Sequence, residues 1–200
     1  MERTALRSPA IGRRRQPVGT WIALGLLLIL AAAGIELAMG REPWCRCGYV
    51  KLWQGQVLSA ENSQHVADWY TPSHIVHGIL FYAALAVALP RAPLGLRAVI
   101  ALAVEATWEV TENTDWVIER YREATIALDY YGDSVVNSVA DMLAMLLGFA
   151  LAAWLPGRLT LAVALGLELL ALVAIRDNLT LNVIMLLHPM EAIRSWQAGG

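Results

Sequence analysis

The chain has 200 residues, of which 58% are hydrophobic and 16% are charged, and its mean hydropathy is +0.50. Soluble domains are about 45–50% apolar, so this composition predicts an integral membrane protein of one domain. The formal net charge of −2 gives no reason to expect a nucleic-acid partner, and two cysteines cannot form a disulfide framework.

Five apolar segments are long enough, or nearly so, to cross a hydrocarbon core of about 30 Å as helices. They cover roughly residues 18–39, 72–89, 97–117, 134–155 and 159–175. We therefore expect an all-α fold, a membrane helical bundle with about five transmembrane helices and one membrane domain over residues 18–200. The basic segment 1–17 is predicted to be disordered. The apolar run of the first span exceeds the usual 7–15 residues of a signal-peptide core, which favours a retained anchor.

Basic residues in three regions fall on one side of this topology: Arg3, Arg7, Arg13, Arg14 and Arg15 before the first span, Arg91 and Arg97 between the second and third, and Arg158 between the fourth and fifth. By the positive-inside rule this side is cytoplasmic. The loop 40–71, the loop 118–133 and the tail 176–200 then lie on the periplasmic side of a bacterial inner membrane.

The loop 40–71 is rich in Trp and Tyr, which favour the membrane interface. Its pair Cys45 and Cys47 has two interpretations: a short-loop disulfide in an oxidising compartment, or an incidental pair of thiols. Two thiols alone are a poor zinc site, because zinc prefers four ligands. The second half of the loop is predicted to form a short helix from Ser59.

The tail begins with polar residues and continues as an apolar run to Leu187, followed by His188 and Pro189. This run is too short to span a bilayer. We expect residues 176–200 to form an interfacial helix over the outer mouth of the bundle.

Two rows of polar side chains stand out within apolar segments. Glu105, Glu109 and Glu112 recur at helical spacing, and so do Asp133, Asn137 and Asp141 on the next span. A charged side chain at the centre of a membrane helix costs about 2.5–3.5 kcal/mol. We therefore expect the two rows to face each other, a cation, water or a substrate rather than lipid.

His74 and His77 lie three residues apart at the start of the second span, at the depth of the acidic rows. Glu and His on facing helices are a known way to hold metals in a bundle. A divalent ion is the expected cofactor if one is bound, with His74, His77, Glu109 and Asp133 as ligands. The expected catalytic groups are Glu109, Asp141, His77 and Glu112. The expected substrate-binding groups are Arg120, Arg122, Asn137, His65 and Tyr70.

Three functions remain open from the sequence. The first is a metal-assisted enzyme that acts from the outer leaflet on a lipid or lipid-linked substrate. The second is a small transporter or proton relay, for which Glu105 and Glu168 would provide titrating groups at mid-depth. The third is a structural partner whose polar core fixes the register of helices in an assembly. Membrane lipids are expected partners in every case, and a protein partner is possible in the third.

Three strings carry a family resemblance: ENSQHVADWYTPSHIVHG, WEVTENTDWVIERYREATIALDYYGDSVVNSVAD and RDNLTLNVIMLLHPMEAIRSWQ. They resemble an uncharacterised family of bacterial multi-pass inner-membrane proteins, a domain of unknown function. The resemblance implies location and topology, and it implies no chemistry. A weaker likeness is to VanZ-like membrane proteins, because His74, Glu109, Arg120, Asp133 and Asn137 keep the order of polar residues in that group.

Overall fold

The computed structural model describes residues 17–125 and 129–199. The predicted disorder of residues 1–17 therefore lies, except for Pro17, outside the described residues. In chain order the helices are α1 (Val18–Ala38), α2 (Thr71–Ala88), α3 (Leu94–Glu112), α4 (Asp115–Ala124), α5 (Val135–Trp154), α6 (Gly157–Ile175), α7 (Leu179–Leu187) and α8 (Glu191–Gln197). The described residues contain no strand, so the all-α prediction is confirmed.

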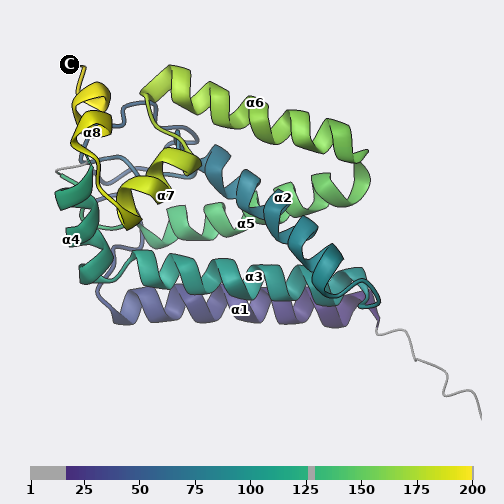
Figure 1. The fold of residues 1–200 in the computed structure, drawn as a ribbon. Helices are drawn as coiled ribbons and strands as arrows, with labels where there is room; N and C mark the ends of the chain where they lie inside the picture. Colours follow the sequence, from purple (N-terminus) through teal and green to yellow (C-terminus); the bar gives the residue numbers. More distant parts are fainter. Residues whose placement is uncertain (1–16, 126–128, 200) are drawn as a thin grey trace, which may run out of the picture.

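The long helices α1, α2, α3, α5 and α6 run side by side, and the short helices α4, α7 and α8 gather at one end of them (Figure 1). We call this end the capped end, and the opposite end, where α2 connects to α3 and α5 to α6, the basic end. The hydrophobic core lies among α1, α3 and α5 and includes Leu102, Met142, Met145 and Phe149.

Two glycines set the close crossing of α2 and α5. A Cβ on Gly78 would lie 1.9 Å from the carbonyl oxygen of Met145, and a Cβ on Gly148 would lie 1.9 Å from that of Ile75. Only a residue without a side chain fits either position, so the two backbones touch. This contact fixes α2 against α5 close to the histidines of α2.

Four described helices, α1, α2, α5 and α6, are long and apolar enough to cross a membrane. Helix α3 has a similar length, but it carries Arg97 and three Glu residues. The predicted third span to residue 117 is too long, because α3 ends at Glu112. Thr114 then caps a separate helix, α4, by accepting a hydrogen bond from the backbone N–H of Val117.

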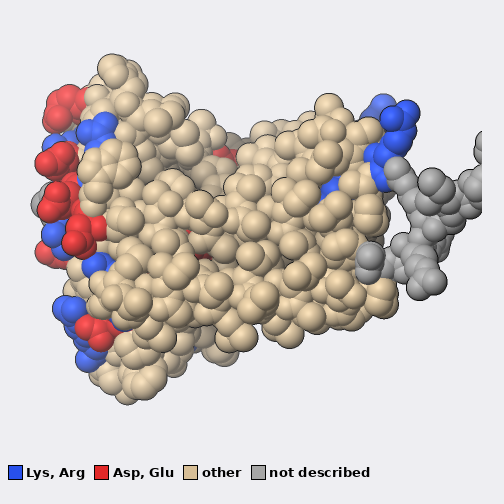
Figure 2. Space-filling view, turned by 90° about the horizontal axis from the view of Figure 1, so that it is seen from below, with Lys and Arg blue, Asp and Glu red and all other residues tan. Residues whose placement is uncertain are grey.

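Charged residues are distributed unevenly along the bundle. Figure 2 shows an almost uncharged middle, with acidic and basic residues mixed at the capped end and only basic residues at the other. Arg91, Arg97 and Arg158 lie in or next to the connections of the basic end. Leucines such as Leu30 on α1 and Leu169 on α6 are more than half exposed, as a lipid-facing surface requires.

Two local predictions are corrected. The loop between α1 and α2 forms turns and bends where a short helix from Ser59 is expected, and Ser63 adopts a positive φ of 57° that interrupts helical geometry. The tail forms two helices rather than one, since α7 ends at Leu187 and Pro189 separates it from α8.

Candidate functional site

A cavity of about 290 Å³ lies at the capped end, among α2, α3 and α5 and next to α4 and α7. One part of its lining is polar: His74, His77, Glu105, Glu112, Asp133, Asn137 and Asp141. The other part is apolar: Phe81, Val104, Trp108, Leu179 and Val183. The described residues that line it include no Lys or Arg.

His74 lies at the centre of the polar part and is 7% exposed. Its Nδ1 atom lies 2.6 Å from Oε1 of Glu105 and 3.3 Å from Oε1 of Glu109. Its Nε2 atom lies 3.8 Å from Oδ2 of Asp141 on α5. One imidazole therefore contacts carboxylates from two different helices, with a different ring nitrogen facing each helix.

His77 lies one turn further along α2 and faces the same carboxylate. Its Nδ1 atom lies 3.2 Å from both oxygens of Glu105, and its ring stacks on Phe81 with centroids 5.7 Å apart. The ligand atoms of His74, His77 and Glu105 all lie within 4.8 Å of one another. Two imidazoles and a carboxylate at this spacing form a set suited to a divalent metal ion.

A second group consists of carboxylates alone. Oxygens of Glu109, Glu112 and Asp133 also lie within 4.8 Å of one another. Asp133 is held in place on two sides, since its backbone N–H donates to Asn113 at 2.7 Å and Tyr130 donates to its Oδ1 at 3.0 Å. Burial raises the pKa of Asp133 well above its ordinary range, and the charge of Glu112 raises it further.

The start of α5 is tied to the loop between α1 and α2. Ser134 caps α5 by accepting from the backbone N–H of Asn137, and Asn137 donates to the carbonyl of His65 at 3.0 Å. Thr71 donates to Oδ1 of Asp141 at 3.2 Å. The loop orients Asn137, and the first residue of α2 orients Asp141.

The predicted metal set His74, His77, Glu109 and Asp133 is divided between the two groups. Glu105, which is missing from that set, joins the histidines, while Glu109 and Asp133 belong to the carboxylate group. Helical spacing places all these residues on facing surfaces, but it does not show which carboxylate is nearest to an imidazole.

Of the predicted substrate-binding residues, Tyr70 and Asn137 line the cavity and three do not. Arg120 donates to the carbonyl of Leu186 at 2.9 Å, and Arg122 donates to the carbonyl of Tyr130. Both guanidinium groups therefore hold backbone carbonyls at the capped end. Among the described residues, the lining of the cavity does not provide the cationic head-group contact expected from the sequence.

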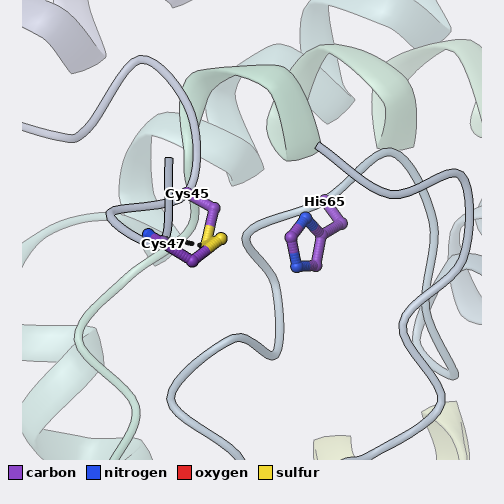
Figure 3. A group of neighbouring side chains, drawn as sticks. All are labelled: Cys45, Cys47 and His65. Atoms are coloured by element: carbon purple, nitrogen blue, oxygen red, sulfur yellow. Dashed lines mark hydrogen bonds between the residues drawn. A yellow bond between two sulfur atoms is a disulfide. The ribbon is translucent and has the colours of Figure 1, made fainter. Parts of the chain in front are cut away.

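His65 lies in the loop, facing the pair Cys45 and Cys47, which form a disulfide (Figure 3). Its Nδ1 atom accepts the backbone N–H of Lys51 at 3.2 Å, and its Nε2 atom lies 3.1 Å from Oε2 of Glu61. Both ring nitrogens and both sulfurs are thus engaged. This supports the disulfide interpretation and leaves no metal ligand in the group.

Two further acids lie outside the cavity, and only one of them, Glu168, was considered from the sequence. Glu36 on α1 is completely buried, and neither of its carboxylate oxygens has a hydrogen-bond partner among the described residues. It went unrecognised, although a lone acid in an apolar span was signal enough. Glu168 accepts hydrogen bonds from Leu179 and Thr180 at the start of α7, so it caps that helix and does not join the cavity.

The fold and the cavity define a class: an all-α membrane protein with a His and carboxylate site buried among its helices. Residues 36–199 match the family described as "Protein of unknown function (DUF2585)", and the chain belongs to this family. The predicted membership of a bacterial family of unknown function is thereby confirmed. The likeness to VanZ-like proteins stays a prediction.

The relatives match over nearly their whole length. The chain is 56% identical to a UPF0314 protein of Paracoccus denitrificans over 191 residues, which are 96% of this chain and 98% of the relative. It is 52% identical to a UPF0314 protein of Brucella anthropi over 194 residues, 95% of this chain and 98% of the relative. No solved structure matches the chain.

Proposed function

We propose that the protein is a membrane-embedded enzyme that uses a divalent metal ion, bound by His74, His77 and Glu105, to act on a lipid or lipid-linked substrate. One observation carries the proposal: three ligand atoms of the right types converge within 4.8 Å at the wall of a cavity. Imidazole and carboxylate together suit several divalent ions.

The charge around the cavity supports a bound cation. Glu105, Glu112, Asp133 and Asp141 line it, and Glu109 lies directly behind, while its described lining contains no Lys or Arg. Buried carboxylates are strongly destabilising unless they are paired or bind a metal. Two protonated histidines and one divalent ion would each supply two positive charges, but the ion would leave the imidazoles neutral and available as ligands.

The lining of the cavity indicates the class of substrate. The polar groups face the apolar side chains of Phe81, Trp108, Leu179 and Val183 across the same space. Such a cavity suits an amphiphile, whose head group would meet the metal site while its chain lies against the apolar part. Its volume of about 290 Å³ suits a head group rather than a whole lipid.

The residues around the metal site have distinct roles in this proposal. A bound metal ion would polarise a head-group oxygen or lower the pKa of a bound water. Asp141 faces the second nitrogen of His74 and orients the ring, as carboxylates commonly do for metal-binding histidines. Glu112 borders the cavity and is only partly buried, so its carboxylate lies next to the space in which a substrate would bind.

We further propose a multi-pass topology in the bacterial inner membrane, with α3 as the fifth span. The basic end would be cytoplasmic, which follows the positive-inside rule, and the capped end with its cavity would face the periplasm. The disulfide in the loop between α1 and α2 suits that oxidising side. Alkaline phosphatase fused after residue 60 should be active and after residue 92 inactive; the reverse pattern would contradict this orientation.

Metal analysis of the purified chain tests the enzyme proposal. The wild type in detergent should retain a divalent ion, and His77→Asn and Glu105→Gln should lose most of it. His188→Asn and Glu123→Gln are matched controls, because both residues are exposed and lie outside the cavity. In a deletion strain, altered lipids should be restored by the wild type and by the controls but not by Glu105→Gln. A metal-free wild type, or full rescue by Glu105→Gln, would contradict the proposal.

A further inference from the structure

We infer that the cavity holds two divalent metal ions, the second bound by Glu109, Glu112 and Asp133, with Glu109 shared between the two. This inference rests on the proposed function, which it deepens from a mononuclear to a dinuclear centre. The first ion belongs to His74, His77 and Glu105.

The second group has the chemistry of a site for a hard cation. Its ligand atoms are carboxylate oxygens from two elements, with Glu109 and Glu112 on α3 and Asp133 just before α5, all within 4.8 Å of one another. Oxygen ligands of this kind suit Mg²⁺ and Mn²⁺. Because the three residues come from two elements, an ion between them would also hold α3 to the start of α5.

Glu109 provides the independent observation. Its side chain is fully buried, and neither carboxylate oxygen accepts a hydrogen bond from a described residue. A buried carboxylate without a donor requires a cation or a proton. One of its oxygens lies 3.3 Å from Nδ1 of His74, a spacing close to that of two ligands on one metal ion, and its carboxylate also lies within reach of Glu112 and Asp133. Its position between both groups is that of a bridging carboxylate.

Charge balance distinguishes one ion from two. Glu105, Glu109, Glu112 and Asp133 carry four negative charges when ionised, which two divalent ions match and a single ion does not. Asp141 stays outside this count as the partner of His74 and Thr71. The two ions therefore leave the metal-binding carboxylates neutralised without any Lys or Arg.

The surroundings of Asp133 already hold it in one orientation. Its Oδ1 accepts from Tyr130, and its backbone N–H donates to Asn113. Gly132 before it has φ +97°, and a Cβ there would lie 2.9 Å from Oδ1 of Asn113. Contacts of this kind orient metal-binding carboxylates in known sites. In two-metal enzymes the pair of ions stabilises both the attacking and the leaving oxygen of a displacement.

Manganese loading of the full-length chain tests the inference. The stripped protein in detergent, reloaded with Mn²⁺, should bind two ions per chain and give the electron paramagnetic resonance spectrum of a coupled pair. Glu112→Gln should bind one ion and give the six-line spectrum of an isolated Mn²⁺. Glu119→Gln, an exposed acid on α4, is the matched control and should keep two. Asp133→Asn is a second variant with the same expected loss, should Glu112→Gln fail to fold.

The outcomes separate this inference from the proposed function. One uncoupled ion in the wild type, lost in His77→Asn and kept in Glu112→Gln, would overturn the second site while the mononuclear enzyme stands. A wild type that binds no ion would overturn both. Two ions in the wild type and in both carboxylate variants would place the second ion elsewhere and overturn the assignment.

Discussion

The Nδ1 atom of His74 lies 2.6 Å from Oε1 of Glu105, and both side chains are almost completely buried. This contact joins α2 to α3 within a bundle whose α2 is already fixed on α5 by Gly78 and Gly148. Polar contacts such as this one, together with the contact between the backbones of α2 and α5, thus hold the three helices that surround the cavity. Each contact yields its own prediction.

Removing the proposed metal ion should destabilise the bundle. Without it, Glu105 and Glu109 repel each other around His74, and ligands that bind only the folded state stabilise it by mass action. We expect EDTA to lower the melting temperature of the wild type in detergent by several degrees, and added Mn²⁺ to restore it. His77→Asn should melt lower than the wild type before EDTA and change little after it. An identical response of both proteins would contradict the prediction.

Gly148→Ala should destabilise the protein strongly. The new Cβ would lie 1.9 Å from a backbone oxygen of α2, which cannot move away as a flexible side chain can. Overpacking commonly costs about 1–3 kcal/mol, and we expect the upper part of that range or more. Gly166→Ala on α6 is the control: an added Cβ would meet no heavy atom within 4 Å apart from its chain neighbours and the backbone of its own helix, so the change should be neutral or stabilising by about 0.5–1 kcal/mol. Thermal melting of both variants measures the difference.

Hydrophobic length and helical spacing predicted much of this architecture. The apolar runs gave the long helices to within a few residues, and the spacing of Asp133, Asn137 and Asp141 placed them on one buried face. The break between α3 and α4 was missed, because apolar residues such as Val117 continue the pattern beyond Asn113. The hydrophobic periodicity of a sequence indicates which face of a helix is apolar. It does not detect an N-cap residue at which a new helix begins.

The contacts made by residues of the candidate site were harder to predict from the sequence. Arg120 and Arg122 were expected near an anionic substrate, but each finds a backbone carbonyl of another segment. Such long-range partners depend on how α4 packs against α7 and the following loop.

The cysteine pair should be protected from alkylation. Cys45 and Cys47 are joined in the structure, and Cys45 is only 2% exposed. We expect a maleimide reagent to label the denatured protein only after reduction, and then at two positions. The double variant Cys45→Ser with Cys47→Ser should remain unlabelled in both conditions. Labelling of the unreduced wild type would show that the pair is a dithiol.

Glu168 should hold α7 against the end of α6. Its carboxylate accepts from the backbone N–H groups of Leu179 and Thr180 at 3.1 Å each, and from the Thr180 hydroxyl at 2.6 Å. A negative charge at a helix start contributes about 0.3–1 kcal/mol, and hydrogen bonds to charged groups add about 1.5–3 kcal/mol. Glu168→Gln should therefore loosen α7 without unfolding the bundle.

Hydrogen exchange measures this loosening directly. Backbone amides of residues 179–187 should exchange several-fold faster in Glu168→Gln, while those of α5 keep their rate. Glu191→Gln, which changes the first turn of α8, is the matched control and should leave α7 unchanged. Because Leu179 and Val183 line the cavity, we also expect faster metal release from Glu168→Gln. Equal exchange of α7 in both variants would contradict the role of Glu168 as a cap.

Asp177, between α6 and α7, should make stability depend on pH. Burial raises its pKa from 3.8 to about 6, even though Tyr70 and the backbone N–H of Asn178 donate to it. Below pH 3.8 the group is protonated in both the folded and the unfolded chain. Between pH 3.8 and 6 the unfolded chain loses the proton while the folded chain keeps it, so the free energy of unfolding falls as pH rises.

The free energy of unfolding should stop falling above about pH 6. The total decrease should be at most about 3 kcal/mol, at 1.36 kcal/mol per pKa unit. Asp177→Asn cannot ionise, so we expect it to melt at or above the wild-type temperature at pH 7.5, with a gap that narrows towards pH 4. Asp129→Asn, at an exposed position, should follow the wild type at both pH values. Melting curves in one detergent across this range provide the measurement. If the melting temperature of Asp177→Asn exceeded that of the wild type by more at pH 4 than at pH 7.5, the ionised carboxylate would stabilise the fold. Only a pKa lowered by folding gives this pH dependence, so the result would contradict the prediction.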